Sequence, residues 1–299
     1  MRTSVSQSAV TDLSWQDLGV LMKSGITAMV VVSTAVGMLL ASSAGPSWAL
    51  WFHTLVGTAL VSAGASALNQ VVERDRDARM RRTADRPIPG GRIHPDIALL
   101  LGVAAATLGL VQLALTVNLF TAVLAAATLI GYVFVYTPMK RASPLATVVG
   151  AVPGAVPPMI GWAAVTGGLD VGAWALFGLL FFWQIPHFLS IAWLYRADYE
   201  RGGFRMISHG DPDGLRTARQ ATLYCAALVP MSLLPAALGL ANAVYFAGAL
   251  ILGLVFLGVS SLFALERSVK NARRLMLASV FYLPAILGVL VLDRLLGWG

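Results

Sequence analysis

Residues 48–87, WALWFHTLVGTALVSAGASALNQVVERDRDARMRRTADRP, join an apolar run of membrane length to a dense group of charged side chains. The apolar part, 48–70, is long enough for a helix to cross the hydrocarbon core of a bilayer, which takes roughly 20 residues. The part that follows holds carboxylates and arginines, which are costly inside a membrane. This junction predicts a membrane-spanning helix that ends in a polar, reactive site.

The spacing of three polar residues at this junction is informative. If the helix continues beyond Ala67, Asn69, Glu73 and Asp77 stand at i, i+4 and i+8 and share one helix face, with about 6 Å of rise between neighbours. Mg2+ prefers oxygen ligands and is commonly held by one or two carboxylates together with substrate phosphate oxygens. The row therefore predicts a Mg2+-diphosphate site with Glu73 and Asp77 as metal ligands.

Cationic side chains near this row are candidate partners for a diphosphate. Arg74, Arg81 and Arg86 lie in the same segment, and their planar guanidinium groups suit phosphate oxygens. Lys140 and Arg141 stand at the end of a later apolar run. They either neutralise a leaving diphosphate or anchor the helix end at the membrane interface, and the residues leave both roles open.

Composition places the chain in a membrane. Of its 299 residues, 58% are hydrophobic and 12% charged, against about 45–50% and about 25% in soluble domains. The basic residues, which give a net charge of +7, fall in short clusters between apolar runs, so no nucleic-acid partner is expected. We predict an all-α integral membrane protein with nine transmembrane helices, near residues 25–45, 48–70, 96–116, 118–137, 144–166, 171–194, 218–240, 243–264 and 275–296.

The distribution of charge also predicts the orientation. All of the 21 Lys and Arg residues except Arg294 fall in the N-terminal segment or in alternate loops. The positive-inside rule then puts the N-terminus in the cytoplasm and the C-terminus outside. We expect a cytoplasmic segment at 1–22 and a single transmembrane domain at 23–299 in the cell membrane, with functional cytoplasmic loops at 69–95 and 195–217. The single cysteine, Cys225, excludes a disulfide within the chain.

A second loop combines carboxylates with arginines on the same predicted side of the membrane. Asp198 follows the end of the sixth apolar run as Glu73 follows the end of the second, so it is a candidate for a second metal ligand. Asp211 and Asp213, further along, are either alternative ligands or part of an ordinary turn before a helix. Because acids contribute little to topology, the two loops are interpreted as two halves of one site.

The sixth apolar run contains polar groups at membrane depth. Trp183, Gln184 and His187 surround Pro186 there, and such groups normally face a cavity or the interior of the bundle. His187 either orients a ring or metal or has a structural role beside the proline.

Together these segments resemble a known family. Asn69-x3-Glu73-x3-Asp77 with Arg81, Thr83 and Arg86-Pro87 resembles the first signature of the intramembrane aromatic prenyltransferases. Three further motifs resemble the branch of that family that farnesylates heme: Tyr136-Thr137-Pro138-Met139-Lys140-Arg141, Trp183-Gln184-x-Pro186-His187-Phe188 and Tyr195-Arg196-x-Asp198-Tyr199. The similarity runs from about Lys23 to the ninth apolar run.

The resemblance implies a nine-helix bundle that binds farnesyl diphosphate through Mg2+. It implies transfer of the farnesyl group to a vinyl carbon of heme b, with water supplying a hydroxyl, to give heme O. Heme A synthase or terminal-oxidase assembly factors would then act downstream. The implied roles are catalysis for Asn69, Glu73, Asp77, Arg81, Lys140, Arg141 and Asp198; diphosphate binding for Arg74, Arg86, Lys140, Arg141, Tyr195 and Arg196; and heme contact for Tyr136, Trp183, Gln184, His187 and Tyr199.

The chain departs from the family pattern at two positions. The usual second carboxylate four residues after Asp198 is replaced by Gly202, and the usual Lys-Pro-Arg near the first span reads Lys23-Ser24-Gly25. Two alternatives stay open, which are a prenyltransferase for another aromatic acceptor such as a quinone precursor and a secondary transporter. The transporter is disfavoured because the carboxylates cluster at one membrane face instead of the midplane.

Overall fold

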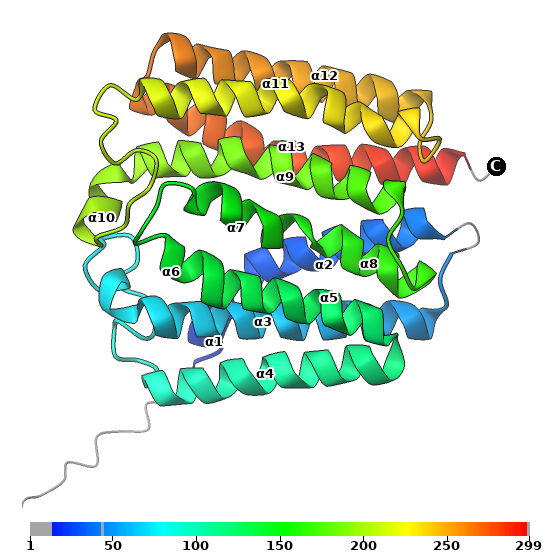
Figure 1. Cartoon of the computed structure of the whole chain (residues 1–299), viewed down its shortest axis with the longest axis horizontal. Helices are drawn as coiled ribbons and strands as arrows, with labels where there is room; N and C mark the ends of the chain where they lie inside the picture. Colours follow the sequence, from blue (N-terminus) through cyan, green and yellow to red (C-terminus); the bar gives the residue numbers. More distant parts are fainter. Residues whose placement is uncertain (1–13, 43–44, 298–299) are drawn as a thin grey trace, which may run out of the picture.

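The computed structural model describes residues 14–42 and 45–297, and every regular element within these ranges is helical. The first thirteen residues of the predicted N-terminal segment lie outside the description. The elements in chain order (Figure 1) are α1 (Trp15–Leu21), α2 (Ser24–Ala41), α3 (Trp48–Asp77), α4 (Pro95–Thr116), α5 (Leu119–Ile130), the π-helix η1 (Gly131–Tyr136), α6 (Thr137–Met139), α7 (Ala146–Ala155), α8 (Pro157–Thr166), α9 (Val171–Leu194), α10 (Arg196–Arg201), α11 (Leu215–Ala237), α12 (Ala243–Leu265) and α13 (Val269–Leu296).

The described residues contain nine helical segments that are long and apolar enough to cross a membrane, which confirms the predicted fold class. The fourth is continuous from α5 through η1 to α6, and the fifth is interrupted between α7 and α8, where Pro157 and Pro158 begin a new helix. Prolines lack the N–H that would continue the ladder of hydrogen bonds from the preceding turn, so the break falls at Val156.

Local sequence signals set several helix starts. The Ser47 hydroxyl accepts a hydrogen bond from Leu50 N at 3.2 Å and caps α3. The Asp170 carboxylate accepts one from Gly172 N at 2.8 Å and caps α9. Pro95 occupies the first turn of α4, where its missing N–H has no partner to lose. These caps satisfy backbone groups that have no partner within their own helix.

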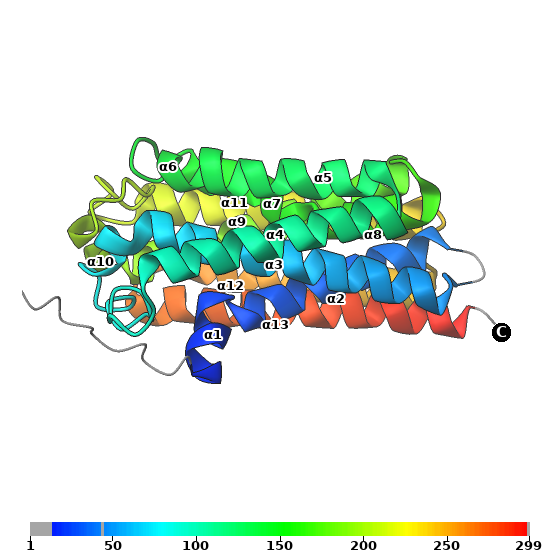
Figure 2. The same cartoon turned by 90° about the horizontal axis from the view of Figure 1, so that it is seen from below.

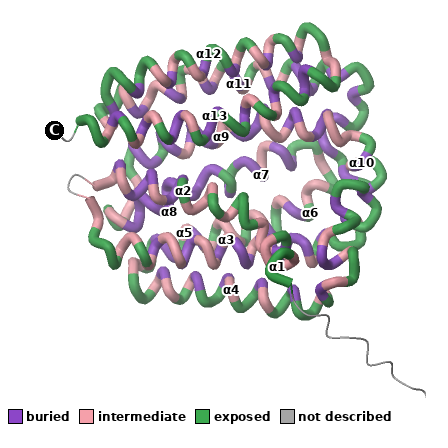
Figure 3. The backbone as a smooth tube through the Cα atoms, turned by 180° about the vertical axis from the view of Figure 1, so that it is seen from behind, coloured by how far each residue is buried: buried purple, intermediate pink, exposed green. Residues whose placement is uncertain are grey.

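The helices differ in how deeply they lie within the bundle. Figure 3 shows buried residues concentrated along α7, α8 and α9, and the buried share is 72% for the α7–α8 span but 28% for α4 and α12. Two glycines allow α2 to approach α8 closely, because a Cβ on Gly37 would clash with the Pro158 carbonyl and one on Gly161 with the Thr34 carbonyl. The outer helices expose apolar side chains, as a bilayer requires.

The segments that carry most of the charge gather at one end of the bundle. The connections after α3, α6, α9 and α12 all lie at the left in Figure 1, and Figure 2 shows the same grouping from below. Two predicted boundaries were wrong. The predicted loop 69–95 begins too early, because residues 69–77 are the last turns of α3, as the one-face spacing of the polar row requires. The last helix begins at Val269 instead of residue 275, so Lys270, Arg273 and Arg274 lie in its first turns.

Candidate active site

The last turns of α3 carry the predicted polar row on a buried face. Asn69, Glu73 and Asp77 are 1%, 4% and 1% exposed, whereas the intervening Arg74 and Asp75 are exposed. The predicted spacing on one helix face is therefore confirmed. Two carboxylates this well shielded from water require compensation by opposite charge or by hydrogen bonds.

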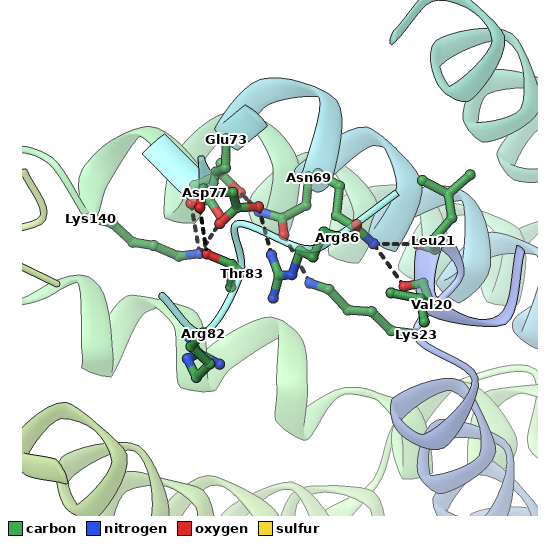
Figure 4. Close-up of polar contacts among 12 residues, drawn as sticks. Val20, Leu21, Lys23, Asn69, Glu73, Asp77, Arg82, Thr83, Arg86 and Lys140 are labelled. Atoms are coloured by element: carbon green, nitrogen blue, oxygen red, sulfur yellow. Dashed lines mark hydrogen bonds and ion pairs between the residues drawn. The ribbon is translucent and has the colours of Figure 1, made fainter. Parts of the chain in front are cut away.

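Each member of the row contacts a cation from a different segment, as Figure 4 shows. The contacts are Lys23 Nζ to Asn69 Oδ1 at 2.9 Å, Lys140 Nζ to Glu73 Oε1 at 2.8 Å and Oε2 at 3.1 Å, and Arg86 Nη1 to Asp77 Oδ2 at 2.7 Å. The three cations outnumber the two carboxylates, so the cluster has a surplus of positive charge. Such a surplus is suited to an anionic ligand.

The short helix α1 and the turn after it position Lys23. Gln70 Nε2 donates to Val20 O at 2.9 Å and Leu21 O at 2.7 Å, which ties the end of α1 to α3. Lys23 follows with φ of +47°, the one non-glycine residue in the described ranges with a left-handed backbone. A left-handed backbone conformation is unfavourable for a lysine. The hydrogen bond from Lys23 to Asn69 offsets part of that cost.

Lys140 is held over the site by contacts with Arg205, Tyr136 and Glu73. Its backbone carbonyl accepts from Arg205 N at 2.8 Å, and its ammonium lies 4.5 Å from the centre of the Tyr136 ring. Burial by itself disfavours the charged form, but Tyr136 and Glu73 outweigh it and raise the pKa of Lys140 above its ordinary value. The raised pKa favours the charged form of Lys140 at neutral pH.

The π-helix η1 and the short helix α6 that follows it orient Asn69. Asn69 Nδ2 donates to Thr137 Oγ1 at 3.0 Å, and that hydroxyl donates to Tyr132 O at 2.8 Å. The Tyr132 hydroxyl accepts from Lys23 Nζ at 3.2 Å. A π-turn inside an otherwise α-helical span is often found at functional sites. Here it places Tyr132, Tyr136 and Thr137 against the polar row.

The second predicted loop meets the first through arginines of the first. Arg76 Nη1 donates to the carbonyls of Gly202 and Gly203, both at 2.8 Å. Arg82 N donates to Asp198 Oδ2 at 3.3 Å, and the Arg82 guanidinium lies 5.2 Å from the centre of the Tyr195 ring and 5.8 Å from that of Tyr199. The two loops therefore form one surface at the end of the bundle, as the sequence predicts.

The carboxylates of the second loop differ in their surroundings. Asp198 is 8% exposed and forms an ion pair with Arg201. Asp211 caps α11, since its Oδ2 accepts from Thr217 N at 2.8 Å and from Thr217 Oγ1 at 2.7 Å, whereas Asp213 is exposed. Of the two interpretations of Asp211, the geometry favours the helix start, and Asp198 remains the candidate for the second ligand.

The oxygen atoms of the row suit a hard cation such as Mg2+, but they do not form a complete set of metal ligands by themselves. Within residues 14–42 and 45–297, no three His, Cys, Asp or Glu side chains lie close enough together to hold a metal ion. Glu73 and Asp77 supply carboxylate oxygens and Asn69 an amide oxygen, which leaves positions for substrate phosphate oxygens as Mg2+ requires. The cations on these oxygens would transfer their contacts to the phosphates.

Several predicted diphosphate partners point elsewhere. Arg74 lies 3.6 Å from Asp75, Arg141 donates to Val72 O at 3.2 Å, and Arg81 is exposed. Arg196 donates to Trp193 O at 2.9 Å and stacks on that ring, with its guanidinium 4.3 Å from the ring centre. These four side chains lie outside the row in this conformation.

Lys23 and Arg82 contact the site and were not predicted to do so. For Lys23 the available signal was its position as a lone lysine directly before the first span. For Arg82 the sequence offered no signal, because it stands beside Arg81 and only the loop conformation decides which of the two lies against Asp198, Tyr195 and Tyr199.

The polar residues of α9 divide between two neighbouring helices. Trp183 Nε1 donates to Ser279 O at 2.8 Å, and His187 Nδ1 lies 2.7 Å from Ser279 Oγ, both on α13. Gln184 Nε2 donates instead to Ala151 O on α7 at 2.8 Å. Of the two interpretations of His187, the structure supports a position within the bundle, paired with a hydroxyl. Its contact with a substrate stays a prediction.

Comparison with known proteins gives concordant results. The model of the UbiA prenyltransferase family matches residues 30–283. A protoheme IX farnesyltransferase of Solibacter usitatus is 47% identical, covering 92% of this chain and 97% of the relative, and one of Salinibacter ruber is 44% identical, covering 93% and 98%. Among solved structures, a UbiA homolog from Aeropyrum pernix has a TM-score of 0.73 at 20% identity, covering 89% of this chain and 96% of the homolog. A UbiA homolog from Archaeoglobus fulgidus bound to GPP and Mg2+ has 0.67 at 14%, covering 92% and 99%.

Proposed function

Because this chain belongs to the UbiA prenyltransferase family, we propose that it transfers the farnesyl group of farnesyl diphosphate to a vinyl carbon of heme b. Water supplies a hydroxyl group, and the products are heme O and diphosphate. The acceptor and donor follow from the names of the relatives, which are 40–47% identical over most of the chain. The same family assignment leaves the transporter alternative without support.

The observation that carries the proposal is the buried row on α3 with its three cations. Cleavage of an allylic diphosphate separates charge, so catalysis needs cations fixed around the leaving group before the bond breaks. Lys23, Lys140 and Arg86 come from three different segments and converge on one helix face. They bind the diphosphate and stabilise the charge that develops on it.

In this proposal Glu73 and Asp77 would hold Mg2+ together with phosphate oxygens, and Asp198 would hold a second ion. The bound metal would supply Lewis-acid chemistry that neutralises the charge of the diphosphate. Tyr195 and Arg196 assist at the second loop, while Arg74, Arg81 and Arg141 form the outer cationic rim. The loop surface made by Arg76, Arg82 and their partners limits the access of water to the reacting carbon.

The acceptor is placed along α9. His187, Trp183 and Gln184 contact heme in this proposal, with Tyr136 and Tyr199 at the boundary between acceptor and diphosphate. The protein resides in the plasma membrane with its N-terminus and its active site on the cytoplasmic side, because the cationic loops lie at one end of the bundle. Its product supplies heme A synthase or terminal-oxidase assembly.

The experiment that tests the proposal compares two neighbouring aspartates. Hemes are extracted from membranes of a bacterium that lacks its own heme farnesyltransferase, after expression of the wild type, Asp77→Asn or Asp75→Asn, and are identified by mass. The Asp77 carboxylate is 1% exposed and paired, whereas that of Asp75 is 82% exposed, so the second variant is a matched control.

We expect hydroxyethylfarnesyl heme from the wild type and from Asp75→Asn, and none from Asp77→Asn at equal expression. Absence of any farnesylated heme from well-expressed wild type would contradict the choice of acceptor. Normal product from Asp77→Asn would contradict the site.

A further inference from the structure

Ser279 of α13 contacts two polar groups through a single hydroxyl. Its Oγ lies 2.7 Å from His187 Nδ1 on α9 and 2.6 Å from Met276 O, one turn earlier on its own helix. The helices α9 and α13 pack side by side (Figure 1), and Ser279 is 0% exposed. Bulk water does not reach this hydroxyl, so the three groups determine its hydrogen bonds among themselves.

One placement of the protons satisfies both contacts. A hydroxyl has one proton and a carbonyl oxygen can only accept, so the Ser279 proton belongs to the contact with Met276 O. The hydroxyl oxygen then accepts from the imidazole, which requires a proton on His187 Nδ1. If the hydroxyl donated to the ring instead, the two oxygens would face each other at 2.6 Å with no proton between them. The contacts therefore require the form of His187 that is protonated on Nδ1.

The second ring nitrogen, Nε2, is then a free base. His187 lies within the membrane-spanning helix α9, where a charged ring is costly, and among the described residues it has no ion pair with a carboxylate. A neutral imidazole that is protonated on Nδ1 keeps a lone pair on Nε2. Within the described ranges Nε2 has no hydrogen-bond partner, and it is not one of the enclosed atoms that lack a partner. This nitrogen is therefore open to a ligand.

Trp183 fixes the plane of the same ring. Its Nε1 donates to Ser279 O at 2.8 Å. The indole and the imidazole are stacked, with 16° between their planes and 5.8 Å between their centres. Ser279 thus contacts His187 through its hydroxyl and Trp183 through its carbonyl. One residue of α13 sets both the protonated nitrogen of the imidazole and the position of the ring stacked on it.

We propose that Ser279 is a positioning residue that keeps His187 Nε2 unprotonated for the acceptor. The inference rests on the proposed function, in which the acceptor is heme b. An ionised propionate is itself an acceptor and a vinyl group is apolar, so neither pairs with a nitrogen lone pair, whereas the iron of the substrate does. His187 Nε2 ligates that iron, and Ser279 is the outer hydrogen-bond partner that histidine ligands generally have.

The first measurement determines the protonation of the ring without any substrate. The full-length chain has four histidines, so solid-state NMR of 15N-histidine-labelled protein in lipid bilayers gives few signals, and His187→Gln identifies those of His187 by difference. We expect a protonated Nδ1 and an unprotonated Nε2 in the wild type and in Ser279→Thr, which keeps the hydroxyl. Ser279→Ala should lose this preference. A wild-type ring protonated on Nε2 alone would overturn the proposal.

The second measurement follows the binding of heme b. EPR of the ferrous nitrosyl complex distinguishes iron with an opposite imidazole from iron without one, and the 15N label alters the splitting when that ligand is a histidine. We expect a histidine ligand in the wild type and in Ser279→Thr, and none in His187→Gln. Heme affinity in a Soret titration should fall about tenfold in Ser279→Ala, because the ligand loses its outer partner.

Ser232→Ala on α11 is a matched control. Ser232 is also 0% exposed, its hydroxyl donates to Val229 O at 2.8 Å in the preceding turn, and its carbonyl accepts from Tyr245 Oη at 2.7 Å. The substitution removes the same kind of hydroxyl without affecting a histidine, so heme affinity and the EPR signal should stay as in the wild type. An equal loss of affinity in Ser232→Ala and Ser279→Ala would overturn the proposal.

The remaining outcomes separate this inference from the reaction. A histidine signal that persists in His187→Gln, or wild-type affinity and ring protonation in Ser279→Ala, would also overturn the role of Ser279. Ligation by His187 without farnesyl transfer by the wild type would reject the proposed function and leave the positioning role standing.

Discussion

The ion pair between Lys140 and Glu73 provides a quantitative test of the site. The two side chains are 13% and 5% exposed, and the ammonium lies within hydrogen-bonding distance of both carboxylate oxygens. Removing one partner leaves the other charge buried without compensation, which costs about 3–5 kcal/mol, whereas replacing both leaves no charge behind. Lys140→Met should therefore be much less stable than Glu73→Gln combined with Lys140→Met.

Thermal unfolding of the purified protein in detergent, followed by circular dichroism, measures the difference. For a chain of this length a loss of about 3–5 kcal/mol lowers the midpoint by about 6–10 °C, at roughly 2 °C per kcal/mol. We expect Lys140→Met to show this loss and the double variant to recover most of it, a coupling that neighbouring residues display in such cycles.

Farnesyl transfer should be lost in both variants, because Lys140 and Glu73 both act on the diphosphate. If the double variant were no more stable than Lys140→Met, the two charges would not compensate each other and the reasoning about the row would be refuted.

Three further predictions follow from single contacts. Lys23→Met should raise the KM for farnesyl diphosphate about tenfold, because one charged contact to the anion is lost, and steady-state kinetics would contradict this if KM were unchanged. Asp211→Ala should lower the free energy of unfolding by about 1–2 kcal/mol, because α11 loses the carboxylate that caps its first turn. In steady-state kinetics its kcat should be unaltered. A collapse of kcat with normal stability would instead indicate that Asp211 is a metal ligand. Gly154→Ala should displace Gln184, whose Oε1 a Cβ would meet, and reduce heme affinity in a Soret titration, while Gly258→Ala, with open space around it, serves as the control.

Much of the site could be predicted from the sequence because helical periodicity is local. Asn69, Glu73 and Asp77 share a face in any regular helix, and the apolar residues before them fix that helix in a membrane. Lys140 was also a candidate, although the sequence alone could not separate a diphosphate contact from an interfacial anchor. Its contact with both oxygens of Glu73 favours the first role.

Other features depend on contacts between segments far apart in the chain. Lys23 reaches Asn69 across 46 residues, and Arg76 reaches Gly202 across 126. No local pattern encodes such distances. The same applies to the choice of Arg82 over Arg81 as the residue that contacts Asp198, and to the division of the α9 polar groups between α7 and α13.

The sequence by itself determined the nine spans, the polar row and the grouping of charged loops, because hydrophobic length and the period of the α-helix are properties of consecutive residues. The tertiary structure decided which cation meets which member of the row and which arginine after α3 contacts Asp198. Those choices depend on how helices pack side by side, and packing is set by the shapes of surfaces that come together only in the folded bundle.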